Sequence, residues 1–321
     1  MYILVAKQLV IMSLLAIVSF IFSKKNNYGK RESEFLSRLL LFVISPCMIF
    51  NTFNIPFSSE KLSALRYSVG CGVMTLVFMI AMSLLVIHSK TEAGKSRDCL
   101  DKMGFVFSNA GFIGIPLING VFGSEGVFPL MGYIAVFNVF LWTFGYYTVN
   151  KHLGIKKIFT NPNVIAIITG IVFFLLPFQM PDVLTQTIRY LGNMNTPISM
   201  IILGLLFSDF KRPQKLEHTP SKRVARTIIF RLIILPFLLL ALYKTILLTI
   251  VPVFALNAEN LKQVMMIIFI AASCPVGMNV ANFAVIYDKD ESYASLLVSI
   301  SSVLCVVSLP LMVRFAEIIL L

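Results

Sequence analysis

The stretch that decides the fold is "SNAGFIGIPLING", Ser108 to Gly120, which lies inside an apolar run long enough to cross a membrane. Its three glycines, one proline and two asparagines are residues that a lipid-embedded helix ordinarily avoids. A proline removes an amide donor and clashes with the carbonyl four residues earlier, so Pro116 is expected to break the helix near Phe112. A second stretch of the same kind, "CPVGMNVAN", runs from Cys274 to Asn282. In lipid, such breaks are tolerated only where protein or a watered cavity surrounds them.

The composition indicates a membrane protein. Of 321 residues, 58% are hydrophobic and 13% are charged, whereas a soluble protein needs about 25% charged residues. The net charge of +12 comes from short basic clusters between apolar runs, which is typical of cytoplasmic loops and not of a nucleic-acid-binding face. Five scattered cysteines without a C-x-x-C pair indicate no disulfide framework and no metal site.

Apolar runs of spanning length predict the membrane topology. Ten such runs cover roughly 2–22, 35–54, 65–87, 103–122, 126–149, 162–179, 184–207, 224–250, 261–286 and 292–318. Most lysines and arginines of the connections follow the odd-numbered runs, so these connections are expected in the cytoplasm and both termini outside. We therefore expect an all-α, multi-pass protein of the cell membrane, in contact with the lipid bilayer and without an appended soluble domain.

The ten runs divide into two matched halves, 1–150 and 151–321. With five runs in each, the second half enters from the opposite side, which is the plan of an inverted repeat. Pro46 in the second run then corresponds to Pro197 in the seventh, and the break at 111–116 corresponds to the break at 275–282. For Pro46 and Pro197 a simple kink is an equally good interpretation; at the two Gly/Pro/Asn-rich breaks a functional role is favoured.

Polar chemistry at membrane depth is expected to come from amides and hydroxyls. The acidic residues and the three histidines lie in or beside predicted loops or, as Glu317, near the last turn, which argues against a carboxylate proton relay, an intramembrane protease or a metalloenzyme. The polar residues inside the runs are Ser45, Asn51, Ser108, Asn109, Asn195, Thr196, Ser273, Asn279 and Asn282. Such groups, with helix N-termini, can hold an anion without a fixed cation.

The chain resembles the auxin efflux carrier family, which includes plant auxin exporters and bacterial permeases for malate- or malonate-like acids. The resemblance covers nearly the whole chain and rests on "SPCMIF", "SNAGFIGIPL", "NPNVIAIITG", "LGLLFSD" and "CPVGMNVANFAVIY". It implies a fold similar to that of bile-acid/sodium symporters, with ten helices, an inverted five-helix repeat and two broken helices that cross at mid-membrane.

The resemblance also implies where the substrate binds. Asn109 and Pro116 match the first crossing segment, and Pro275, Gly277 and Asn279 match the second. The expected substrate-binding residues, with the backbone amides beside them, are Asn109, Gly111, Gly114, Pro116, Pro275, Gly277, Asn279 and Asn282. Plant exporters carry a further proline where this chain has Val280, so a hydrophobic aromatic acid is the less favoured cargo.

The sequence thus predicts a secondary carrier for a small organic anion, a mono- or dicarboxylate, which works by alternating access. An anion channel and an auxin-like exporter stay as alternatives, and a membrane enzyme or sensor is disfavoured because no nucleophile–base pair is visible. No cofactor is expected. A coupling ion, Na⁺ or H⁺, the identity of the anion and a homodimer are left open.

Overall fold

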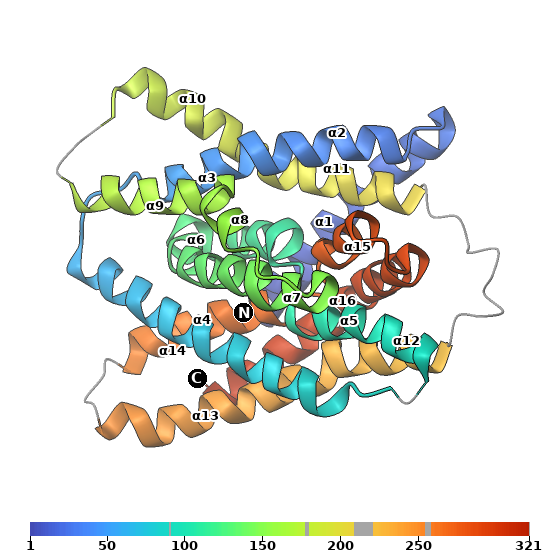
Figure 1. Ribbon diagram of the computed structural model, residues 1–321. Helices are drawn as coiled ribbons and strands as arrows, with labels where there is room; N and C mark the ends of the chain where they lie inside the picture. Colours follow the sequence, from blue (N-terminus) through green and yellow to red (C-terminus); the bar gives the residue numbers. More distant parts are fainter. Residues whose placement is uncertain (90, 177–179, 209–220, 254–257, 321) are drawn as a thin grey trace.

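A computed structural model describes residues 1–89, 91–176, 180–208, 221–253 and 258–320, and all named elements in these ranges are helical (Figure 1). Elements marked η are π-helical turns. The first half contains α1 (Tyr2–Asn26), α2 (Lys30–Leu39), η1 (Leu40–Ile44), α3 (Ser45–Phe53), α4 (Ser59–Val86), α5 (Glu92–Val106), η2 (Ala110–Gly114), α6 (Ile115–Phe140), η3 (Leu141–Gly145) and α7 (Tyr146–Asn150). The second half contains α8 (Ile155–Phe159), α9 (Pro162–Leu175), α10 (Asp182–Asn193), α11 (Asn195–Ser208), α12 (Ser221–Ile229), η5 (Phe230–Ile234), α13 (Leu235–Val253), α14 (Ala258–Ala272), α15 (Met278–Ile286) and α16 (Glu291–Leu320).

Seven helical segments of the described chain are long and apolar enough to cross a membrane. They are Tyr2–Asn26, Arg31–Phe53, Ser59–Val86, Ala110–Asn150, Asp182–Ser208, Lys222–Thr249 and Glu291–Leu320. The prediction of an all-α integral membrane protein therefore agrees with the structure, whereas ten spans in two inverted halves stay a prediction. The two separate runs expected at 103–122 and 126–149 are not separated by a loop in the structure. Ala110–Asn150 is one helical run, with a kink at Gly123 (φ 65°). Glycine adopts this left-handed backbone without strain, so no polar loop is needed there.

The distribution of exposed apolar side chains fits a lipid environment. Along α1, the side chains of Leu4, Leu14 and Val18 are all more than half exposed. A soluble protein would rarely expose a contiguous apolar face of this kind. The opposite extreme is α14, where each residue from Val264 to Ala272 is at most 1% exposed. Hence α14 lies at the centre of the bundle, and α1 lies at its rim.

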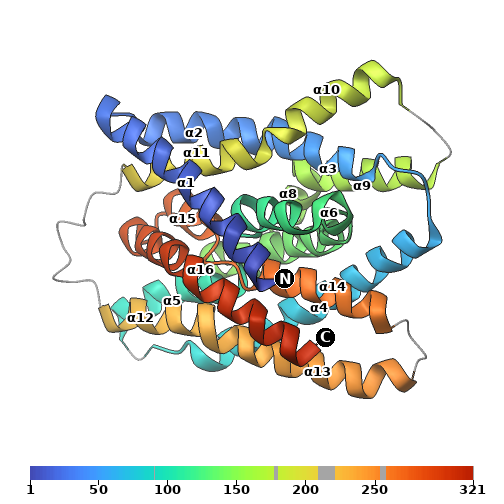
Figure 2. The same cartoon turned by 180° about the vertical axis from the view of Figure 1, so that it is seen from behind.

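The helices gather in two groups with a central set between them. In Figures 1 and 2, α2, α3, α9, α10 and α11 lie along one side, and α4, α12 and α13 lie along the opposite side. Between them are α6, α7, α15 and α16. In the first group α3 packs along α9 and α10, and α1 joins this group because it packs along α11. We call α1, α2, α3, α9, α10 and α11 the scaffold, and the remaining helices except α8 the core.

Proline explains three of the π-helical turns. Pro46, Pro116 and Pro236 each come two residues after a π segment ends, namely η1, η2 and η5. Because proline offers no amide hydrogen to the carbonyl four residues earlier, the chain widens there to longer-range bonding. The helices therefore continue past these prolines with a local irregularity instead of ending.

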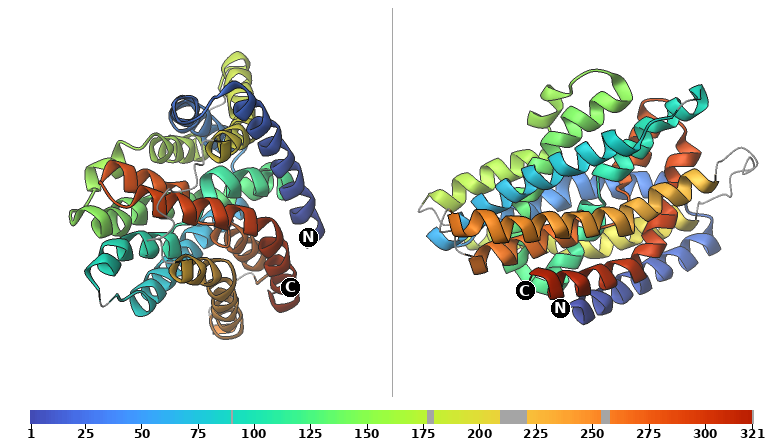
Figure 3. Two further views of the ribbon diagram at one scale, coloured as in Figure 1. Left: turned by 90° about the vertical axis from the view of Figure 1, so that its right-hand side faces the viewer. Right: turned by 90° about the horizontal axis from the view of Figure 1, so that it is seen from below.

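The two ends of the bundle differ in charge. The chain termini lie side by side (Figure 3), and the terminal amine of Met1 is 2.6 Å from the Glu317 carboxylate. We call this the termini end. At the opposite end, called the basic end, lie the described connecting residues 27–29, 87–89, 91, 151–154 and 287–290, and most of the basic clusters of the described chain are in or next to them. The common side of both termini agrees with the predicted topology; which side of the membrane they face stays a prediction.

Candidate functional site

Each of the two sequence stretches expected to break a helix contains a break, but both breaks begin earlier in the chain than the predicted 111–116 and 275–282. The chain accommodates Pro116 with the π-helical turn η2, and α15 is already helical from Met278 onward. The two breaks pair with each other. The first break, residues 107–109, separates α5 from η2, and the second, residues 273–277, separates α14 from α15. The Asn109 amide nitrogen donates to the Pro275 carbonyl oxygen (2.8 Å), and the Gly277 amide nitrogen donates to the Phe107 carbonyl oxygen (2.9 Å). Ser108 and Val276 thereby form an antiparallel bridge. Backbone groups that lose their helical partners thus satisfy one another inside the bundle.

Close approach of the two breaks explains one glycine. A methyl group at Gly277 would lie 2.8 Å from the Ser108 carbonyl oxygen and 2.9 Å from that of Phe107. Real side chains do not approach backbone atoms so closely, so only glycine fits. Gly114 is buried and less crowded, with Cys274 Sγ 3.5 Å from the same methyl position, and Gly111 is exposed with nothing within 4 Å.

Asn109 is held firmly, yet it keeps one free donor group. Its side chain is 2% exposed, and its Oδ1 accepts a hydrogen bond from the Phe112 amide (3.3 Å), which caps η2. The carboxamide nitrogen Nδ2 has no hydrogen-bond partner among the described residues. A buried donor without a partner costs free energy, about 1–3 kcal/mol, so a polar group that accepts from it would stabilise this arrangement.

A buried arginine at the breaks corrects the expectation that amides and hydroxyls alone act at membrane depth. Arg231, in η5, is fully buried. Its guanidinium donates to the carbonyl oxygens of Cys274 (2.8 Å from Nη2), Phe105 (2.8 Å from Nη1) and Ala272. These carbonyls belong to the C-terminal ends of α5 and α14 and to the break after α14, where the helix dipole is negative. A fixed cation therefore lies against both broken helices.

Sequence reasoning missed Arg231 because the residue lies seven positions inside the run predicted at 224–250. An arginine so near the end of a span commonly extends its head group toward the membrane surface. Arg231 instead binds backbone carbonyls that have lost their helical hydrogen-bond donors at the breaks in two other helices. The available signal was an arginine within "FRLIILPF", five residues after Arg226 and surrounded by apolar side chains.

A polar cavity of about 880 Å³ lies between the scaffold and the core, toward the termini end. The scaffold contributes Asn51, Asn195 and Pro197 to its wall, and the core contributes Pro116 and Gln263. Further residues of the wall are Gln8, Met48, Thr52, Asn54, Lys61, Asn119, Glu125, Thr185, Arg189, Asn193, Thr196 and Asn260. Its volume falls in the range of small-molecule sites, roughly 300–1,000 Å³.

Asn195 resembles Asn109 in its hydrogen bonding. Its Oδ1 accepts from the Ser45 hydroxyl (3.0 Å), and its buried Nδ2 has no partner in the described part of the chain. Helix α11, which Asn195 opens, packs against η2, which Asn109 caps. Two carboxamides with an unused N–H₂ group therefore stand on neighbouring elements, one on the scaffold and one on the core.

The structure brings only part of the predicted site together. Pro116 and Pro197 line the polar cavity, whereas Asn109, Gly277 and Asn279 are not part of its wall. Asn279 is half-buried near the start of α15, and Asn282 is exposed one turn later. Pro275 is buried within the second break, and Pro46 is half-buried in α3. Asn109 and Asn279 share no hydrogen bond.

A second finding concerns an acidic residue beside the loop predicted before residue 103, which lies in helix α5. Asp101, on α5, is fully buried at the basic end. Its carboxylate accepts from the Tyr293 hydroxyl (2.6 Å), the Thr227 hydroxyl (2.8 Å) and Arg223 Nε (2.6 Å). The network joins α5, α12 and α16, so it holds core helices together near the basic end. The sequence could not show it, because its members lie far apart along the chain.

Asp98, one turn before Asp101, belongs to the same network. Its carboxylate accepts from Arg223 Nη2 (2.6 Å) and from the Ser89 hydroxyl (2.6 Å). Burial alone would raise the pKa of Asp98, but the hydrogen bonds from Ser89 and Arg223 and the arginine charge outweigh it and hold the pKa below its ordinary value. Asp98 is therefore ionised at neutral pH and neutralises Arg223.

The described elements of the chain are helical, and several are apolar and long enough to span a membrane. Two interrupted helices pair at their breaks, and a polar cavity lies beside them. These are the features of a membrane transporter. The family model described as "Membrane transport protein" matches residues 4–155 and 149–313. The chain belongs to this family, the auxin efflux carrier family that the sequence motifs resemble.

Two relatives support the same class. An "Uncharacterized transporter" of Methanothermobacter thermautotrophicus is 24% identical over 304 residues, which covers 92% of this chain and 93% of the relative. An "Uncharacterized transporter" of Methanocaldococcus jannaschii is 24% identical over 308 residues, with 89% and 91% covered. The family and these relatives indicate a multi-pass membrane transporter and not an enzyme.

Proposed function

We propose that this protein is a secondary carrier for a small organic anion, a mono- or dicarboxylate such as malate or malonate. The substrate carboxylate binds beside the first break, between scaffold and core. The single observation that carries the proposal is the buried Asn109 carboxamide, whose position is fixed by hydrogen bonds while its Nδ2 donor has no partner among the described residues. A carboxylate oxygen is a strong acceptor for such a group.

Electrostatics supports an anion at this place. The N-terminal ends of η2 and α15 both start at the breaks, and a helix N-terminus carries a partial positive charge. Arg231 adds a full positive charge, and the titratable side chains beside it in the described chain are Tyr133, Cys274 and Cys305. The groups that its guanidinium binds there are carbonyl dipoles and the Met79 sulfur, not carboxylates. The region of the breaks therefore favours a negative ligand over a positive one.

Helix packing supports an inverted five-plus-five repeat, with halves 1–150 and 151–321. If the halves correspond, α1 corresponds to α9, and the second-span pair α2/α3 corresponds to α10/α11. The structure has α1 packed along α11 and α9 packed along α3, which is the reciprocal pattern that such a symmetry requires. Alternating access would then consist of the core moving against the scaffold, so that the cavity opens in turn at each end.

The cavity wall favours a small, strongly polar substrate over an aromatic one. Carboxamides and hydroxyls are the most numerous polar groups of the wall, and its charged residues are Glu60, Lys61, Glu125 and Arg189, with Lys61 3.9 Å from Glu125. An auxin-like acid would need an apolar platform for its ring, and Phe128 is the one aromatic side chain among the described residues of this wall. Val280 also stands where the plant exporters have a second proline, so we favour a bacterial-type carboxylate permease.

Uptake of labelled malate, malonate, lactate and an indole acid into proteoliposomes tests the proposal. Sodium, proton and voltage gradients are imposed one at a time to find the coupling ion, if there is one. We expect saturable uptake and counterflow of a short carboxylate, both reduced at least tenfold by Asn109→Ala and by Asn279→Ala. Asn163→Ala, at the start of α9 in the scaffold, is the matched asparagine control. Normal transport by both Asn109→Ala and Asn279→Ala would refute the assignment of the site.

The same preparation separates a carrier from a channel. A carrier shows counterflow, because a labelled anion exchanges against an unlabelled one on the other side. A channel shows single-channel currents and no counterflow. Currents through the wild-type protein that Asn109→Ala leaves unchanged would replace the carrier proposal with a pore.

A further inference from the structure

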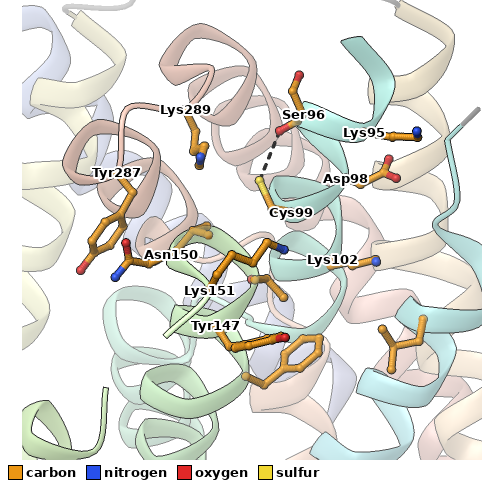
Figure 4. Close-up of a pocket in the computed structure, with 14 residues that line it drawn as sticks. Lys95, Ser96, Asp98, Cys99, Lys102, Tyr147, Asn150, Lys151, Tyr287 and Lys289 are labelled. Atoms are coloured by element: carbon orange, nitrogen blue, oxygen red, sulfur yellow. Dashed lines mark hydrogen bonds between the residues drawn. The ribbon is translucent and has the colours of Figure 1, made fainter. Parts of the chain in front are cut away.

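A second cavity, of about 790 Å³, lies at the basic end, on the far side of the breaks from the polar cavity (Figure 4). Three separate segments form most of it: α5, the end of α7 with the residue after it, and the turn between α15 and α16. Its charged and polar wall residues are Lys95, Ser96, Asp98, Lys102, Tyr147, Thr148, Asn150, Lys151, Tyr287 and Lys289. Four lysines and one carboxylate therefore line one cavity.

The positive charge of this cavity is only partly neutralised by its neighbours. Asp98, its one acidic wall residue, is bound to Arg223 at 2.6 Å. Asp290, beside Lys289, is bound to Arg97 at 2.7 Å. Within the described part of the chain, Lys102, Lys151 and Lys289 form no ion pair. The carboxylates of Asp98 and Asp290 thus form ion pairs with arginines and not with these lysines.

Two of the lysines lie near the same cysteine. Figure 4 shows Lys289 beside Cys99 and Lys151 below it in this view, and both charges act on the Cys99 thiol. Like charges repel, so bringing them together is unfavourable unless an anion lies between them. Lysine residues at this end of a membrane protein usually reflect the topology alone. Lysines from separate segments that line one cavity, with Tyr147 in the same wall, go beyond that rule.

We propose that this basic cavity is a binding site for a multivalent oxyanion, with phosphate or carboxylate groups that several lysines contact at once. The proposal is independent of the carrier's substrate site. Its ligand is either a soluble anion or the head group of an anionic lipid, and both offer the same chemistry to the lysines. Helix α5 runs from this cavity to the first break, and α15 runs from the second break to it. An anion here would therefore tie together the basic-end segments of both broken helices.

Direct binding tests the site, with pyrophosphate as the probe. The full-length protein is placed in nanodiscs of phosphatidylcholine, and titration calorimetry gives the dissociation constant. We expect the double variant Lys151→Gln/Lys289→Gln to weaken binding by about tenfold or more, as the loss of two nearby charges implies. Lys25→Gln, an exposed lysine on the scaffold at the same end, is the matched control and should bind as the wild type does. Absence of binding, or equal binding by the double variant, would overturn the proposal.

A second measurement localises the anion and identifies its source. Cys99 lines the cavity, so pyrophosphate should slow its alkylation by N-ethylmaleimide in a Cys47→Ala background, where the other cysteines are buried. Nanodiscs that contain phosphatidylglycerol distinguish the sources. Competition by this lipid assigns the site to a head group, and unchanged pyrophosphate binding assigns it to a soluble anion. Unprotected Cys99 at saturating pyrophosphate would show that the anion binds elsewhere. Asn109→Ala should leave binding intact, so a failure of the carrier proposal would not be mistaken for a failure of this one.

Discussion

The contact between the two breaks makes Gly277→Ala the most informative single substitution. The backbone there has φ −70° and ψ 144°, a conformation that alanine adopts freely, so no conformational strain is added. The cost comes from space alone, because the new methyl group would lie 2.8 and 2.9 Å from two backbone carbonyl oxygens. Neither atom can rotate away as the end of a side chain would. The two breaks must therefore separate.

The magnitude follows from what the separation removes. Overpacking by one methyl group costs about 1–3 kcal/mol. Loss of the hydrogen bonds from Asn109 N to Pro275 O and from Gly277 N to Phe107 O adds roughly 1–3 kcal/mol for the pair. We therefore expect Gly277→Ala to lower the free energy of unfolding by about 2–6 kcal/mol. Asn109 would shift with its backbone, so transport should fall as well.

Gly111→Ala is the matched control for this experiment. It lies in the adjoining η2, and nothing is within 4 Å of the position of its methyl group. Alanine in a helical turn is slightly more favourable than glycine, by about 0.5–1 kcal/mol. Unfolding of both variants in mixed micelles, with increasing sodium dodecyl sulfate, gives the two free energies. If Gly277→Ala proves as stable as Gly111→Ala, the breaks do not depend on close approach at this glycine.

Three further predictions concern the charged and amide groups. Arg231→Met should lower the free energy of unfolding by several kcal/mol, because each buried carbonyl left without a donor costs about 1–3 kcal/mol. Arg231→Lys keeps the charge, so its free energy of unfolding should fall less in the same micelle assay. Equal losses for the two variants would contradict the carbonyl-binding role of Arg231. The pKa of Asp98 is lower in the folded protein than in the unfolded chain, where it is about 3.9. Its pair with Arg223 therefore contributes its full stabilisation above this unfolded pKa, and that stabilisation is lost as the pH falls through the folded pKa. The melting temperature should thus fall more between pH 5 and pH 3 in the wild type than in Asp98→Asn, and parallel curves would refute this. Asn195→Ala should raise the KM for substrate offered from the termini end more than from the basic end, since Asn195 lines the cavity that lies toward the termini end. Equal effects in oriented vesicles would count against a moving core.

The breaks could be predicted from sequence because their causes are local. Proline, glycine and asparagine act within one turn of the chain. Pro275 and Gly277 therefore mark the second interruption, and Asn109 marks the end of the first, whereas Pro116 only widens the helix at η2. The pairing between them is a consequence of the membrane, because unsatisfied backbone groups cannot remain in lipid. Both inferences use only short-range chemistry and the nature of the solvent.

The surroundings of the breaks could not be predicted, because they depend on contacts between distant segments. Arg231 binds the carbonyls of residues 41–43 positions later in the chain and of Phe105, which is 126 positions earlier. Asp101 receives hydrogen bonds from residues more than 120 positions away. A single sequence assigns such charges to the nearest loop, since hydropathy treats every charge near a span end as solvated.

The position of Arg231 bears on how the proposed carrier would bind an anion at the breaks. In each broken helix, the half that ends at the break presents carbonyls, and the half that begins there presents amide hydrogens. Arg231 occupies the carbonyl side, where a small cation would otherwise be stabilised. The amide side, at the start of η2 and α15, keeps its positive character, and Asn109 lies at the start of η2. The Arg231 guanidinium thus donates hydrogen bonds to the carbonyls at the breaks. The electrostatic potential that the free amide groups leave there favours a negatively charged substrate. An anion carrier built this way has no structural need for a sodium ion at these carbonyls, which is why the ion gradients in the uptake assay must be varied separately.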